Sequence, residues 1–63
     1  MPFEVLVRGE LSGELMADLG ARQFDFHRGK TLILLDVIDQ SHLHGVLGWF
    51  EAHNIEIERV NPV

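Results

Sequence analysis

The sequence has no cysteine, and this absence removes several classes of protein at once. Without thiols there is no disulfide framework, no cysteine-based zinc or iron–sulfur site, no thiol catalysis and no Cys-dependent copper carrier. Basic residues are also few, because five Lys and Arg stand against ten Asp and Glu, for a net charge of −5. A phosphate backbone attracts cations, so this balance argues against nucleic acid as a partner.

Long hydrophobic runs are missing too. No apolar stretch approaches the ~20 residues that a membrane span needs, and the first residues lack the basic and apolar regions of a signal peptide. We therefore expect a cytoplasmic protein with no membrane partner.

The length of 63 residues and the hydrophobic content of 46% predict one small soluble domain over residues 1–63. A chain of this size buries only about 60% of the surface that its unfolded form exposes, so its own core gives a thin stability margin. With no disulfide available, association with another chain is the remaining common source of stability.

Hydrophobic periodicity switches between two and 3.6 residues along the chain, which predicts alternating strands and helices. Ser12 and either Asp39 or Ser41 are suited to cap helices, and Gly20 and Asn54 are suited to end them. The predicted strands cover 3–8, 22–27, 31–38 and 55–58, and the predicted helices cover 12–19 and run from 39–41 to about 53.

The order β-α-β-β-α-β has one compact solution with right-handed crossovers and a central hairpin. It is the α+β, ferredoxin-like fold, with a four-stranded antiparallel sheet in the order 4-1-3-2 and both helices on one face. The runs around Val5 and Leu34 are the most apolar, as central strands should be. The runs around Asp25 and Glu56 alternate strictly, as edge strands do.

The third strand is apolar at both parities, although helices can cover only one face of the sheet. One of two sets must therefore lie on the helix-free face beside Leu6: Ile33, Leu35 and Val37, or Leu32, Leu34 and Ile38. We take the first set as the interface. An apolar patch on a small soluble protein usually marks an interface, which predicts a homodimer formed face to face through the sheets or by edge pairing.

The second helix offers four more candidate interface residues: His42, Gly45, Trp49 and His53. Glycine inside a helix costs roughly 1 kcal/mol relative to alanine, so Gly45 and Gly48 favour the close approach of another backbone, ring or ligand. Alternatively, they make room for Trp49 within the same chain. His42 and His53 lie about 16 Å apart on a helix, too far to chelate one ion, so we expect no metal and no cofactor.

Catalytic arrangements are few. Asp36 and Asp39 are close in sequence, but a helix cap and a position on the sheet explain them better than proton transfer does. The opening Pro-Phe-Glu-Val-Leu-Val-Arg resembles the first strand of oxalocrotonate-tautomerase-like proteins. This resemblance implies that Pro2, once Met1 is removed, would be an N-terminal base in a cofactor-free enzyme. That family has one long helix where this chain has Gly20 and the Phe24/Phe26 strand.

A second resemblance covers the C-terminal third. The segment from Asp39 to Leu47 is similar to the D-Q-x-x-L-H-G-x-L segment of short uncharacterised bacterial proteins, and the architecture is similar to ACT-type regulatory domains. Together they imply a small bacterial module without catalytic residues. We expect a non-catalytic interaction or ligand-sensing module that homodimerises through its sheet and takes a protein partner or a small effector. The alternatives are the tautomerase-like enzyme and a subunit of a larger complex.

Overall fold

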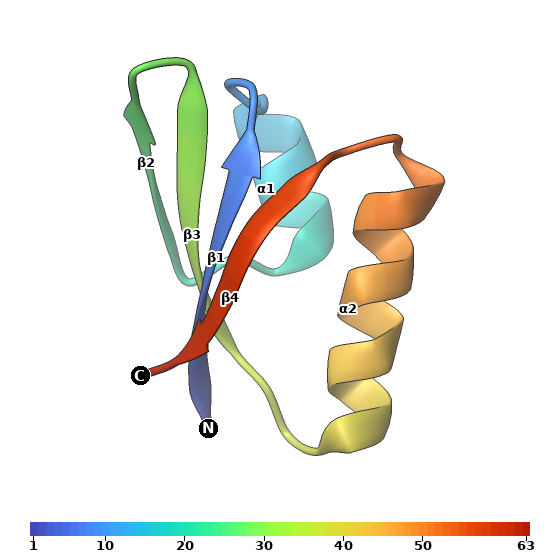
Figure 1. The fold of residues 1–63 in the computed structure, drawn as a ribbon. Coiled ribbons are helices and arrows are strands. Elements are labelled where there is room, and N and C mark those ends of the chain that lie inside the picture. Colours follow the sequence, from blue (N-terminus) through green and yellow to red (C-terminus); the bar gives the residue numbers. More distant parts are fainter.

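The computed structural model describes residues 1–63, which form four strands and two helices (Figure 1). The strands form one antiparallel sheet in the order β2-β3-β1-β4, and the same row reads 4-1-3-2 from the other edge. The predicted α+β class, with a four-stranded antiparallel sheet and two helices, is confirmed. The elements are β1 (Pro2–Arg8), α1 (Gly13–Leu19), β2 (Gln23–His27), β3 (Lys30–Asp36), α2 (Gln40–Ala52) and β4 (Ile57–Pro62).

Side-chain caps set where both helices begin. The Ser12 hydroxyl accepts a hydrogen bond from the Leu15 amide at 3.2 Å, and Asp39 Oδ1 accepts one from the His42 amide at 2.9 Å. At the other end of α1, Gly20 takes the left-handed φ of 80° and donates to the carbonyls of the last turn. These contacts satisfy backbone groups that helix ends leave without partners, as the sequence predicted.

Both helices pack on the same face of the sheet (Figure 1). Residues paired directly across antiparallel strands share a face, and Val5 pairs with Ile33 on β3 and with Val60 on β4. One cluster of buried side chains joins β1, β3, α1 and α2. Its members are Val5, Val7, Met16, Ile33, Leu35, Val37, Val46 and Phe50.

The last strand differs from the prediction of residues 55–58. The Ile55 amide still donates to the Phe50 carbonyl at the end of α2, so the strand begins only at Ile57. Pro62 lies inside the strand, opposite Phe3. Proline is tolerated there because β4 is an edge strand.

A β-bulge interrupts the pairing of β4 with β1. Val7 lies opposite Ile57, but Leu6 lies opposite Arg59, which leaves Glu58 as an extra residue. The insertion keeps Ile57 and Val60, three positions apart, on the helix-covered side, where both pack against the core. It also sets Glu58 and Arg59 toward the opposite side.

Candidate interaction surface

The helix-free face of the sheet has an apolar centre formed by Leu6, Leu32 and Leu34. Leu6 pairs directly with Leu32, and all three side chains are half-buried. The face is hollowed beside Leu32 and Leu34, with a volume of about 120 Å³ bordered by Glu4, Gln23, Phe24 and Asp25. We call Leu6, Leu32 and Leu34 the leucine patch.

The prediction that Ile33, Leu35 and Val37 line this face is wrong. These residues are 0%, 3% and 3% exposed and belong to the core, so they are not available to a partner. Because β3 has apolar residues on both of its faces, the sequence pattern alone does not say which face lies against the helices. The pairing of Ile33 with buried Val5 decides it, and the other set supplies the open face. Of that set, Ile38 lies beyond the strand and is 86% exposed.

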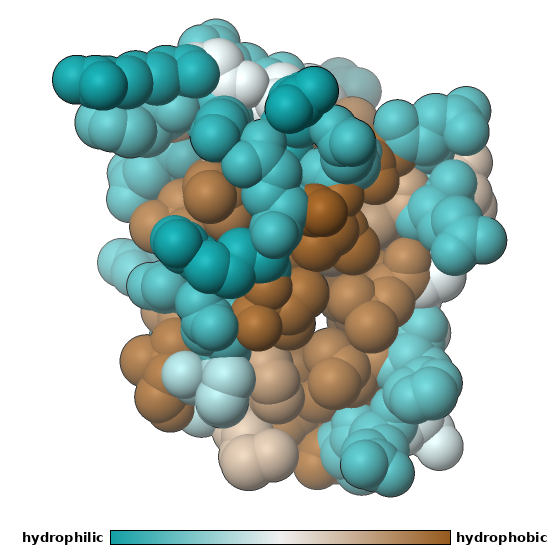
Figure 2. Space-filling view, in the orientation of Figure 1, coloured by the Kyte–Doolittle hydropathy of each residue, from teal (hydrophilic) through white to brown (hydrophobic).

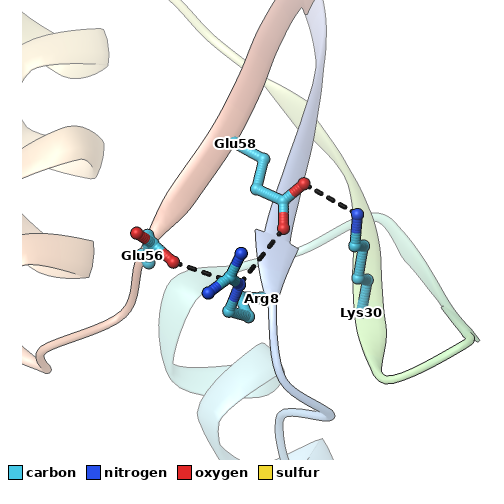
Figure 3. A network of polar contacts seen from close by, with 4 residues as sticks. All are labelled: Arg8, Lys30, Glu56 and Glu58. Atoms are coloured by element: carbon cyan, nitrogen blue, oxygen red, sulfur yellow. Dashed lines mark hydrogen bonds and ion pairs between the residues drawn. The ribbon is translucent and has the colours of Figure 1, made fainter.

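An ion-pair network crosses one end of the helix-free face of the sheet (Figure 3). Glu58 on β4 lies between two cations: its carboxylate is 2.8 Å from Lys30 Nζ on β3 and 3.5 Å from Arg8 Nε on β1. Arg8 also contacts Glu56 at 3.1 Å. The hydrogen bond from Lys30 is the main cause that lowers the pKa of Glu58 from its ordinary value of 4.5, and Arg8 adds to the effect. The network therefore ties three strands together with an ionised carboxylate.

Charge is divided unevenly between the two sides of the molecule. Segments 9–21 and 37–55, which contain both helices, carry five acids and no Lys or Arg. The rest of the chain, which forms the sheet and its hairpin, carries the other five acids and all five basic residues. The helix side thus holds the whole net charge of −5, and the sheet side is balanced.

The predicted interface residues of α2 lie on the helix side, away from Leu6. His42 is half-buried, and its Nδ1 accepts a hydrogen bond from the Ile38 amide at 3.1 Å. Trp49 packs against the core and donates from Nε1 to Asp18 on α1 at 3.1 Å. Its ring also lies 4.1 Å, centroid to centroid, from that of exposed His53. The structure therefore does not bring these residues together with the leucine patch.

Neither glycine of α2 is needed for packing within the chain. A Cβ at Gly45 or Gly48 would meet no atom within 4 Å, so these glycines do not make room for Trp49. We expect Gly45→Ala to raise the free energy of unfolding by about 0.5–1 kcal/mol, because alanine restricts the unfolded chain more than glycine does. Urea denaturation at one fixed protein concentration measures this change. Weaker self-association of G45A, detected by sedimentation, would instead show a partner close to Gly45.

A second apolar surface lies between β4 and α2. Figure 2 shows hydrophobic residues gathered there between hydrophilic borders. The groove has a volume of about 390 Å³ and is lined by Leu47, Glu51, Ile55, Ile57 and Val60. It opens at the edge of the sheet, on the side of the molecule that carries the acids.

The groups considered for catalysis have separate structural partners. Asp36 lies 3.4 Å from Arg22, and Asp39 caps α2. Pro2 begins β1 opposite Asp36 and lines none of the three hollows of the surface. No three His, Asp or Glu side chains converge in a way that could hold a metal ion. Neither helix has the length and hydropathy needed to span a bilayer.

Sequence reasoning missed the residues that border the leucine patch, chiefly Asp25, Glu58 and Arg59. One signal was present. Ile57 and Val60 are both apolar and lie three positions apart, and a regular strand would place them on opposite faces. The spacing therefore indicated a bulge between them, where Glu58 lies.

Comparison with known proteins adds a family but no relative of known activity. No curated protein and no solved structure matches the chain. A family model described as "Domain of unknown function (DUF8691)" matches residues 2–61, which include all or nearly all of every strand and helix. The chain therefore belongs to this family.

Proposed function

We propose that the protein is a small non-catalytic interaction module that works as a homodimer, pairing through the helix-free face of its sheet. The order of the strands and the shared face of the helices support a ferredoxin-like fold, which is part of the proposal. A cytoplasmic location is also part of the proposal.

One observation carries this function: the sheet side combines an apolar centre with balanced charge. Two helix sides brought together would each contribute five acids without a base, and like charges repel. Two sheet sides carry no such penalty and bury the leucine patch. The groove between β4 and α2 is also apolar, but it lies on the acidic side.

The size of the face is that of a weak interface. Four strands at ~4.8 Å spacing and about seven residues at ~3.4 Å give a face of roughly 450 Å² per copy. Two such faces together bury roughly 900 Å², below the ~1,200–2,000 Å² of stable interfaces and typical of weak ones, so we expect a dissociation constant in the micromolar range or weaker.

Leu32→Asn should weaken the dimer, because it puts an amide at the centre of the leucine patch. Sedimentation velocity from about 1 to 500 µM brackets the expected affinity, and we expect L32N to stay monomeric where the unchanged protein is dimeric. Leu47→Asn is the matched control, since Leu47 is half-buried in the groove instead. Circular dichroism confirms that both variants are folded.

Three results would contradict the proposal. One is a monomer across the whole range. Another is an L32N dimer as strong as the original. The third is loss of the dimer in L47N but not in L32N, which would assign the interface to the groove.

A further inference from the structure

The leucine patch lies in a row that crosses the whole sheet. Leu6 pairs with Arg59 on β4 and with Leu32 on β3, and Leu32 pairs in turn with Asp25 on β2. Directly paired residues share a face. The open face therefore presents, from one edge to the other, a cation, two leucines and a carboxylate.

The two charges at the ends of this row have no ionic partner within the chain. The ion pairs of the molecule use Arg8, Arg22 and Lys30 as cations and Asp36, Glu56 and Glu58 as anions. Asp25 and Arg59 take part in none of these ion pairs. Both side chains are exposed, so both are available to a second molecule.

A row of this kind is complementary to itself in one orientation. A two-fold axis parallel to the strands, between Leu6 and Leu32, reverses the row and sets cation against carboxylate at both ends. An axis across the strands would set Arg59 against Arg59 and Asp25 against Asp25. The first orientation makes two Arg59–Asp25 attractions, whereas the second makes one repulsion between arginines and one between aspartates.

The spacing of packed sheets suits this contact. Facing sheets lie ~10 Å apart, which an arginine and an aspartate side chain span together. The row spans three strand spacings, or about 14 Å. Aligned sheets cross at roughly 30°, which moves each end of the row by roughly 4 Å, within the reach of arginine.

We infer that a second copy of this chain docks on the helix-free face with Asp25 of each copy against Arg59 of the partner subunit and Leu6 against Leu32 of the partner subunit. This inference rests on the proposed function and adds the orientation of the two copies. In this arrangement, the contact between Asp25 and Arg59 of the partner subunit selects one orientation of the two leucine patches.

Charge reversal tests the orientation. Asp25→Arg and Arg59→Asp should each replace two attractions by two repulsions and raise the dissociation constant of the dimer roughly tenfold or more. The double variant D25R/R59D restores both attractions and should return to within about threefold of the unchanged protein. An equimolar mixture of the two single variants should form a mixed dimer under conditions where each alone is monomeric, and sedimentation velocity at low salt measures all four samples.

Arg28→Asp is the matched control, because Arg28 lies in the hairpin turn outside the row and makes no ion pair. It should leave the dissociation constant unchanged within about threefold. The orientation is wrong if the double variant and the mixture stay monomeric, or if the single variants dimerise as R28D does. In those cases an intact effect of L32N would leave the sheet-face dimer standing, whereas a monomeric unchanged protein would remove both proposals.

Discussion

Phe50→Ala should destabilise the protein more than any other substitution proposed for it. Phe50 is 0% exposed and joins α2 to the buried face of the sheet. Replacing a buried Phe by Ala costs about 3–5 kcal/mol, through lost transfer energy and the cavity left behind. Domains have about 0.05–0.15 kcal/mol of stability per residue, or roughly 3–9 kcal/mol for this chain, so the cost is between about a third and all of the margin. Urea denaturation followed by circular dichroism, at one protein concentration, measures the loss.

Phe26→Ala provides the matched control for the same change of side chain. Phe26 is 49% exposed on edge strand β2 and contacts Phe24 at 5.8 Å between ring centroids. We expect F26A to lose about 1 kcal/mol or less. Equal losses in F26A and F50A would contradict the core assigned to Phe50.

Thr31→Val should have the second-largest effect on stability, although it changes almost no volume. Thr31 is the one buried polar residue, and its hydroxyl donates to the Gly9 carbonyl at 2.6 Å and accepts from the Leu11 amide at 3.1 Å. Valine leaves both backbone groups without a partner, at a cost of about 1–3 kcal/mol for a buried group. Urea denaturation measures the loss, and hydrogen exchange should show a faster Leu11 amide.

Thr31→Ser separates the hydroxyl from the methyl group. Serine keeps both hydrogen bonds and loses one buried methyl, which costs about 1 kcal/mol. T31V should therefore be less stable than T31S. The reverse order would mean that Thr31 acts through packing and not through its hydrogen bonds to the loop between β1 and α1.

The elements were predictable because local signals agreed with tertiary needs. Ser12, Gly20 and Asp39 each have the cap role that their residue type favours. The hairpin turn has positive φ at Gly29, which glycine adopts readily, and also at Arg28. Such features depend on a few neighbouring residues, so a single sequence contains them.

The candidate site was harder to predict, because it depends on register. Which parity of β3 faces the helices is decided by the pairing of Ile33 with Val5, a contact between distant segments. The ion pairs of Glu58 with Arg8 and Lys30 likewise need the bulge and the order of three strands. His42, Gly45, Trp49 and His53 stay predicted interface residues, on a side of the molecule distinct from the leucine patch.

The division of charge also bears on how far assembly proceeds. In a pair joined through the open faces, both outward surfaces are helix layers, each with five acids and no Lys or Arg. Such surfaces repel those of neighbouring pairs at neutral pH. We therefore expect the proposed pair to grow no further, because the same charges that disfavour helix-to-helix contact also disfavour stacking into filaments.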